Sequence, residues 1–335
     1  EYRCNECGHL SPRWEGRCPI CETWGNYELV SNSSLEKSGR IKLGQTIATT
    51  PIRLGDEAFS NYGERISVGK KEIDRLLGGG MVAGSVLLMA GEPGIGKSTL
   101  LLQIAAHWAT SGLNVLYVSG EESGPQVRLR GQRLEENTSE ILFMPETQME
   151  GIFDHLQQIK PQALVIDSVQ TLNSEHIASP AGSINQIREN TQLLVEWAKQ
   201  TDAPLLISGH VTKDGTIAGP RVLEHMVDVV LYLEGDSLRS YRFLHSTKNR
   251  FGSTNDVALL EMRANGLREI DDPSAAFIGE RQEGVPGSAV IANLEGTRPI
   301  LAEVQALTSH SAFTPPRRTT TGIDLGRLAM ITAVL

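Results

Sequence analysis

Residues 86–99 read V-L-L-M-A-G-E-P-G-I-G-K-S-T, an apolar run followed by a glycine-rich turn that ends in Lys-Ser-Thr. The apolar run predicts a buried strand, and the pattern from Leu100 to Trp108 predicts a helix directly after the turn. This order of strand, loop and helix is typical of a phosphate-binding loop, or P-loop. Its glycines let successive backbone N–H groups point inward at phosphate oxygens, and the helix N-terminus adds partial positive charge.

The loop defines a set of candidate contacts to a nucleoside triphosphate and its magnesium ion. Lys97 would reach the β- and γ-phosphates, and the Ser98 hydroxyl would ligate Mg²⁺. A glycine-rich turn with a chance Lys-Ser is the alternative, and the strand and helix on either side argue against it. The predicted ATP contacts are Gly91, Glu92, Pro93, Gly94, Ile95, Gly96, Lys97, Ser98 and Thr99.

Two further apolar runs are followed by acids that hydrolysis would need. The run at 163–166 leads into Asp167, which at the carboxyl end of a strand is the candidate to support Mg²⁺. The run at 114–118 precedes Glu121 and Glu122, and an acid beside the P-loop strand can polarise the attacking water. We take Glu121 as the base. The sequence alone leaves open Glu122, a pair of solvated acids, or an Asp167 that only caps a turn.

A third run, at 204–208, leads into His210. His210 could contact the γ-phosphate and report its loss, or it could be a structural histidine, and the sequence favours neither reading. The following segment at 212–221 is glycine-rich, polar and basic. It predicts either a switch loop that couples nucleotide state to a partner or a plain surface connection.

Strand and helix patterns alternate through the middle of the chain. An apolar stripe at helical spacing runs from Ile184 to Ala198. Short, continuously apolar strands separated by helices predict an α/β fold with a mostly parallel sheet covered on both faces. Strands are expected at 85–90, 114–118, 141–144, 163–166, 204–208, 228–233, 241–247 and 257–262.

All four cysteines lie within the first 21 residues, as two C-x-x-C pairs ten residues apart: Cys4 and Cys7, then Cys18 and Cys21. Two such knuckles present four thiolates to one tetrahedral zinc ion. Disulfides are the alternative, and the lack of an export signal beside a nucleotide-binding domain disfavours them. Four thiolate ligands leave no open coordination position, so the zinc would be structural. Because so small a unit has little core of its own, zinc binding would supply its folding energy.

Length and composition predict several domains in this chain of 335 residues. We expect a zinc knuckle at 1–30, a polar linker at 31–54, the α/β domain at 55–272, and a β-rich unit at 273–335 that is incomplete. The net charge of −9 disfavours a chain coated in basic patches but allows a local DNA path. Because no apolar run is long enough to span a membrane and no leader is visible, we expect a cytoplasmic protein.

Several features together carry a resemblance to known proteins. The stretch L-L-G-G-G-M-V-A-G-S-V-L-L-M-A-G-E-P-G-I-G-K-S-T at 76–99 resembles RecA-like ATPases. It is joined by the cysteine pairs, the pentapeptide K-N-R-F-G at 248–252 and the tail E-G-V-P-G-S-A-V at 283–290. The combination resembles the bacterial RadA (Sms) family of DNA-repair proteins over essentially the whole chain. The final unit resembles the start of a Lon protease domain.

The resemblance implies an ATP-driven motor of the DnaB helicase type. Such a motor forms a ring, usually a hexamer, and drives branch migration on single-stranded and branched DNA together with RecA. ATP would lie between subunits, where Lys248 and Arg250 would reach the γ-phosphate from the neighbour and also support DNA binding. Segments 173–183 and 212–221 match DNA-contacting loops. The implied phosphate contacts are Lys213 and Arg221, with Arg317 and Arg318 on an outer surface.

Other functions compete with this one. A RecA-fold signalling ATPase of the circadian-clock kind shares the L-G-G-G segment, but it is not expected to carry the cysteine pairs or the pentapeptide. An ATP-dependent protease would need a Ser-Lys dyad, which 273–335 does not offer, so we expect no proteolysis. A non-enzymatic zinc-ribbon adaptor is disfavoured by Lys97, Glu121 and Asp167. The zinc knuckle itself could bind DNA or RecA.

Overall fold

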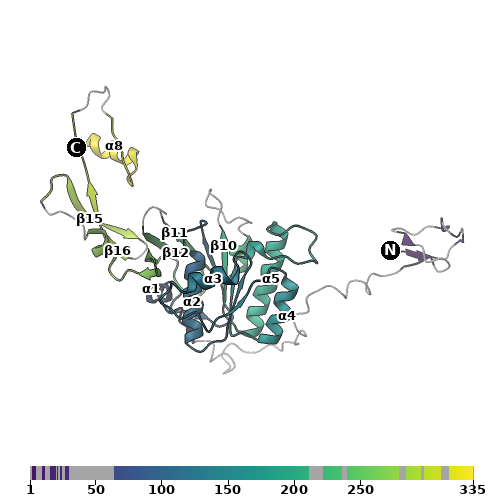
Figure 1. Cartoon of the computed structure of the whole chain (residues 1–335). Helices are drawn as coiled ribbons and strands as arrows, with labels where there is room; N and C mark the ends of the chain where they lie inside the picture. The colour runs from purple at the N-terminus through teal and green to yellow at the C-terminus, as the bar shows by residue number, and fades with distance from the viewer. Residues whose placement is uncertain are drawn as a thin grey trace, which may run out of the picture. The chain divides into compact units, whose positions relative to one another are not determined.

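The computed structural model describes residues 2–4, 10–11, 16–19, 21, 23–24, 27–29, 64–210, 222–235, 240–278, 284–295, 298–310 and 317–334. The chain divides into two compact units, Glu1–Ile270 and Asp271–Leu335, drawn in Figure 1.

A nine-stranded sheet forms the centre of the first unit. Its strands are β6 (Val86–Gly91), β7 (Val115–Ser119), β8 (Leu142–Met144), β9 (Ala163–Asp167), β10 (Leu205–His210), β11 (Val229–Glu234), β12 (Tyr241–Asn249), β13 (Val257–Arg263) and β14 (Gly266–Glu269). They lie in the order β14-β13-β12-β11-β6-β10-β9-β7-β8. The strands from β11 to β8 are parallel, whereas β12, β13 and β14 extend the sheet in antiparallel fashion.

Helices cover both faces of this sheet. They are α1 (Lys71–Leu76), α2 (Lys97–Thr110), α3 (Gly124–Gly131), α4 (Met149–Ile159), α5 (Ile184–Thr201) and α6 (Val222–Met226). Side chains of β6 alternate between two cores: Leu87 and Met89 pack with α1 and α2, and Val86 and Leu88 pack with α4 and α5. Every residue of β6 is buried, which explains its continuous apolar run. The predicted α/β class with a mostly parallel sheet is confirmed.

Several boundaries differ from those expected. β10 continues to His210 and β12 to Asn249, so each strand ends two residues beyond the range expected for it. The sequence pattern missed β14, a strand of four residues joined to β13 by a tight hairpin. β14 supplies the N-terminal cap of α1, because the Glu269 carboxylate accepts hydrogen bonds from the backbone N–H groups of Lys71, Glu72 and Ile73. Two short strands, β4 (Arg65–Ile66) and β5 (Met81–Val82), form a separate antiparallel pair.

The cysteine-rich segment forms a small antiparallel sheet in the order β2-β1-β3. Its strands are β1 (Tyr2–Cys4), β2 (Leu10–Ser11) and β3 (Tyr27–Leu29). A turn between them is closed by the Cys18 N–H, which donates to the Thr23 carbonyl at 2.9 Å. Cys4 and Cys18 are buried.

The second unit contains α7 (Pro273–Ile278), the hairpin of β15 (Ser288–Glu295) and β16 (Arg298–Gln305), and α8 (Leu325–Val334). These elements lie close to the expected segments at 288–294 and 300–307 and the expected terminal helix. The Leu301 N–H on β16 donates to the Ser274 hydroxyl on α7 at 3.2 Å. Within the ranges given above, no helix in either unit has the length and apolar character needed to cross a bilayer.

Candidate active site

The P-loop connects the carboxyl end of β6 to the first turn of α2, as the sequence predicts. Gly94 and Gly96 have φ angles of 77° and 118°, a region that only glycine adopts easily. A Cβ on Gly96 would lie 2.5 Å from the Met262 Cε, so the end of that flexible side chain would have to move, and the main demand for glycine here is the φ angle. Among the described residues, no protein acceptor is present for the N–H groups of Gly94, Gly96 or Lys97. These donors are the ones that a P-loop turns toward phosphate.

The ammonium group of Lys97 is held at the base of this loop. Its Nζ donates to the carbonyls of Gly91 and Glu92, both at 2.9 Å, and contacts His210 Nδ1 at 3.2 Å. Burial lowers the pKa of Lys97, while Asp167 and Glu121 act in the opposite direction. An incoming phosphate could take the place of the two carbonyls as the partner of the ammonium group.

Asp167 lies at the end of β9, between β7 and β10. Its carboxylate accepts the Tyr117 hydroxyl at 2.8 Å and the Ser208 hydroxyl at 2.5 Å. Burial raises the pKa of Tyr117 well above its usual value, so this hydroxyl stays a donor. Asp167 is only 4% exposed, and these two hydrogen bonds fix the orientation of its carboxylate.

Glu121 and His210 form a hydrogen-bonded pair beside Lys97. His210 Nε2 lies 2.8 Å from Glu121 Oε1, and the Ser168 hydroxyl donates to the same oxygen. Because His210 Nδ1 faces the ammonium donor of Lys97, we assign the ring proton to Nε2. The hydrogen bond from His210 lowers the pKa of Glu121 from 4.5 to about 2, with Ser168 and Lys97 acting in the same direction. Glu121 is thus a carboxylate at neutral pH.

Glu122, the alternative base, has a different partner. Its carboxylate pairs with Arg130 on α3 at 2.5 Å. The two adjacent glutamates therefore have different surroundings: Glu121 faces Lys97 and His210, and Glu122 anchors α3.

Ser98 lies in the first turn of α2 and is partly buried. The Ser98 hydroxyl and the Asp167 carboxylate are the hard oxygen ligands that Mg²⁺ prefers, so the residues at this end of the sheet fit that ion.

Lys248 and Arg250 lie at the opposite end of the sheet from the P-loop. Lys248 Nζ donates to the carbonyls of Glu224, His225 and Val227 at the end of α6, at 2.8, 3.3 and 2.7 Å. Arg250 Nη1 pairs with Asp228 at 2.9 Å. The strand register aligns Arg250 with the start of β6, whereas the P-loop follows its end, about 16 Å further along. Neither cation reaches the P-loop of its own chain.

The rest of the pentapeptide packs against the L-G-G-G turn. Asn249 Nδ2 donates to the Leu76 carbonyl at 2.9 Å, and Arg65 donates to the Phe251 carbonyl at 3.2 Å. A Cβ on Gly78 would lie 2.9 Å from that same carbonyl oxygen, which explains one glycine of this turn. Two sequence motifs that are more than 160 residues apart are therefore parts of one local structure.

The segment at 173–179 is organised by Gln186, a residue that the sequence did not single out. Gln186 on α5 is fully buried, and its Oε1 accepts the Ser174 N–H at 3.0 Å. Its Nε2 lies within 3.1 Å of the Asn173 side chain and of the carbonyls of Ser174, Ile177 and Ser179. The first half of the expected DNA loop is thus a defined structure that the start of α5 holds in place.

The structure describes only some of the other predicted DNA contacts. The whole of the expected loop at 212–221, including Lys213 and Arg221, lies outside the described residues. Arg317 and Arg318 are exposed in the second unit. The sequence analysis missed three hydroxyl groups that bind the carboxylates of Asp167 and Glu121, those of Tyr117, Ser168 and Ser208. They lie within or just after ordinary apolar strands, so no sequence pattern marks them.

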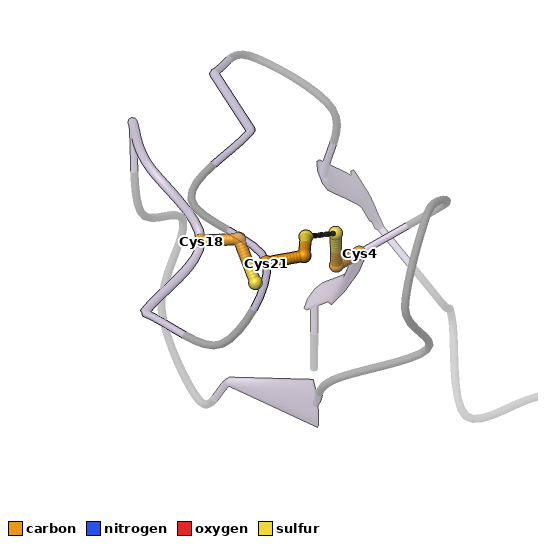
Figure 2. A group of neighbouring side chains, drawn as sticks. All are labelled: Cys4, Cys18 and Cys21. Atoms are coloured by element: carbon orange, nitrogen blue, oxygen red, sulfur yellow. Dashed lines mark hydrogen bonds between the residues drawn. The ribbon is translucent and has the colours of Figure 1, made fainter.

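Three of the four cysteines form a cluster of thiols (Figure 2). The sulfur atoms of Cys4, Cys18 and Cys21 lie within 4.8 Å of one another, and those of Cys4 and Cys21 are 3.6 Å apart. This spacing is too long for a disulfide and close to that of two thiolates sharing one tetrahedral zinc. Cys7 lies outside the described residues. The cluster fits the predicted metal centre and disfavours disulfides among these three cysteines.

The fold and the site together define a RecA-like P-loop ATPase preceded by a cysteine-rich metal-binding unit. Residues 60–216 match the family described as an AAA domain, and residues 2–26 match the rubredoxin metal binding domain. The crystal structure of a KaiC-like protein from Pyrococcus horikoshii aligns with a TM-score of 0.51 and 20% sequence identity. The alignment covers 62% of this chain and 99% of that one, and it supports the fold alone.

Relatives named "DNA repair protein RadA" align over the whole of this chain. The protein from Streptococcus pyogenes is 47% identical, and those from Listeria monocytogenes and Mycolicibacterium smegmatis are each 44% identical. In each case the alignment covers 100% of this chain and 73% of the relative. The chain belongs to the RadA family of DNA-repair proteins, and the resemblance seen in the sequence is confirmed.

Proposed function

We propose that this chain is the ATP-hydrolysing part of a DNA motor that acts in recombinational repair. The observation that carries the proposal is the hydrogen-bonded series from Lys97 through His210 to Glu121, at the carboxyl ends of neighbouring parallel strands. It joins a phosphate-binding lysine to an ionised acid through one histidine. Membership of a DNA-repair family supports DNA as the partner.

The chemistry of hydrolysis follows from these positions. The P-loop N–H groups and Lys97 would bind the phosphates of ATP, and Ser98 with Asp167 would hold Mg²⁺. That ion, when bound, neutralises charge on the phosphate oxygens. The Glu121 carboxylate would orient the attacking water and accept its proton, and His210 could register the loss of the γ-phosphate through its bond to Glu121.

Transfer of force to DNA requires more than one subunit. Because the side chains of Lys248 and Arg250 bind groups at the end of the sheet opposite their own P-loop, any contact they make with a γ-phosphate must be to that of a neighbouring subunit. This supports a homo-oligomeric ring, with six subunits as the expected number. We propose that 173–183, Lys213 and Arg221 line a basic channel for single-stranded or branched DNA, and that Lys248 and Arg250 support it. Arg317 and Arg318 would add an outer contact.

We further propose helicase-type translocation that drives branch migration together with RecA. The cysteine-rich unit would bind one structural Zn²⁺ through Cys4, Cys7, Cys18 and Cys21, and it would present its surface to RecA or to DNA. No Ser-Lys dyad was recognised in the sequence of 273–335, so we propose a scaffolding role for that unit and no proteolysis.

The test is steady-state ATP hydrolysis with and without single-stranded DNA at two salt concentrations, on a sample whose mass is measured by light scattering. We expect turnover that DNA stimulates, that higher salt weakens, and that requires a ring-sized particle. Lys97→Ala is the control, and it should abolish turnover while leaving thermal unfolding unchanged. Turnover that ignores DNA, or a particle that stays monomeric, would contradict the motor.

A further inference from the structure

Arg242 is a buried charged residue that the mechanism above does not use. It lies near the start of β12, in the antiparallel extension of the sheet, and is only 5% exposed. Burying a guanidinium group is strongly unfavourable unless its donors find acceptors. The acceptors that Arg242 uses therefore indicate what the residue is for.

One of these acceptors belongs to the P-loop. Arg242 Nε donates to the Ile95 carbonyl at 3.1 Å, and Nη1 donates to the Tyr241 carbonyl at 2.8 Å. The same strands also support the loop through apolar contact, since Met262 and Leu267 lie against Gly96. The P-loop is thus braced from β12, β13 and β14 as well as from β6 and α2.

The bond from Arg242 determines how the peptide between Ile95 and Gly96 is turned. This peptide is trans, so its carbonyl and its N–H point in opposite directions. With the Ile95 carbonyl held toward Arg242, the Gly96 N–H points away from β12. Among the described residues that N–H has no protein acceptor, and it lies at the N-cap of α2 beside the other phosphate-facing donors.

We propose that Arg242 is a positioning residue that holds the 95–96 peptide with its N–H toward the phosphates. The peptide needs an outside restraint because Gly96, which follows it, has no Cβ to restrict rotation about its φ angle. A rotated peptide would turn the Ile95 carbonyl oxygen, with its partial negative charge, toward the phosphates. The inference rests on nucleotide binding at the P-loop, which belongs to the proposed function.

The test compares Arg242→Met with Arg268→Met, a matched change at an exposed arginine on β14. Binding of a fluorescent ADP analogue is measured without DNA, and inorganic tripolyphosphate is used as a competitor. Loss of a hydrogen bond to a charged group should weaken binding of both ligands about tenfold in Arg242→Met. The KM for ATP should rise by about the same factor, with kcat changed less than about threefold, and Arg268→Met should match the wild type.

Arg242→Lys keeps a cation with the reach to donate, and it should recover part of the affinity. If Arg242→Met does not fold, the comparison of Arg242→Lys with the wild type carries the test, with about threefold weaker binding expected. Affinities within about twofold of wild type would overturn the proposal, as would weaker ADP binding with unchanged tripolyphosphate binding. Failure of the wild type to bind ADP or ATP would instead contradict the proposed function.

Discussion

At the scale of single residues, the site depends on which side chains share a hydrogen bond. Glu121 and Glu122 are adjacent in the sequence, yet one bonds to His210 and the other to Arg130. The difference arises because the chain turns between β7 and α3, so that consecutive side chains point in different directions. The choice of Glu121 as the base stays a prediction, and its contacts to His210 and Ser168 support it.

The lowered pKa of Glu121 predicts a specific effect of acid on stability. Its carboxylate titrates near 2 in the folded chain and near 4.5 when unperturbed, so the folded chain binds fewer protons between these values. The stabilisation is complete above pH 4.5 and is lost as the pH falls toward 2. We expect the stability of the wild type to fall more steeply than that of Glu121→Gln across this window, as measured by urea unfolding. Equal slopes would contradict the assigned hydrogen bonds.

At the scale of elements, α5 fixes the loop that precedes it. Its N-cap Ser183 accepts the Gln186 N–H at 3.4 Å, and the buried Gln186 side chain then binds the 173–179 segment. The same segment is tied to the start of α4, where the Met149 N–H donates to the Asn173 carbonyl at 2.9 Å. A DNA contact made by this loop would therefore act on two helices at once.

Gln186→Ala should destabilise the first unit by about 2 to 4 kcal/mol, because it leaves several buried polar groups without partners. Gln192→Ala on the exposed side of α5 is the control, and it should change stability by about 0.5 kcal/mol or less. Chemical denaturation measures both. Hydrogen exchange should also rise within 173–179 in Gln186→Ala. Unchanged exchange there would mean that Gln186 does not hold the loop.

The cysteine-rich unit predicts a second element-scale result. Cys18 is fully buried in the thiol cluster, so Cys18→Ser removes one of the proposed zinc ligands. We expect loss of bound zinc and of the fold of residues 1–30, with the thermal unfolding of the ATPase domain unchanged. Metal content and calorimetry measure these two effects separately. A destabilised ATPase domain would contradict the independence of the two parts.

At the scale of the whole molecule, the pentapeptide is the segment that we propose reaches a neighbouring subunit. Within one chain, Lys248 caps α6 and Arg250 neutralises the buried Asp228. Burial lowers the pKa of Lys248, and nearby Arg250 acts in the same direction. These contacts give both cations a structural role in the isolated chain, and a role in a neighbour's site would be additional.

Mixing experiments can detect such a shared site. Arg250→Ala should reduce turnover of the assembly at least about tenfold, because it removes charge stabilisation in the transition state. Mixed with Lys97→Ala, it should regain part of the activity, since some interfaces then combine an intact P-loop with an intact Arg250. Activity that is no greater than the sum of the two variants alone would contradict action between subunits. Arg268→Ala is the control for a charge change on the same sheet.

Much of this protein could be read from local sequence patterns. The P-loop, the apolar strands ending near Asp167 and Glu121, and the cysteine pairs are signals within about 25 residues, and each depends on backbone conformation or burial that its own residues dictate. This is why the α/β class, the strand order along the chain and the family were predictable. The ends of elements, such as the end of β10 at His210, were less predictable, because hydrogen bonds to neighbouring strands decide where a strand stops.

Contacts between distant segments were decided only by the tertiary structure. The pairing of Lys97 with His210, the support of Ile95 by Arg242 and the packing of the pentapeptide on Gly78 join residues 113, 147 and more than 160 positions apart. Hydrogen bonding of buried polar groups selects these partners, and that selection depends on the register of strands that are not neighbours in sequence. The sequence by itself determined which chemical groups are present, and the sheet determined which of them meet.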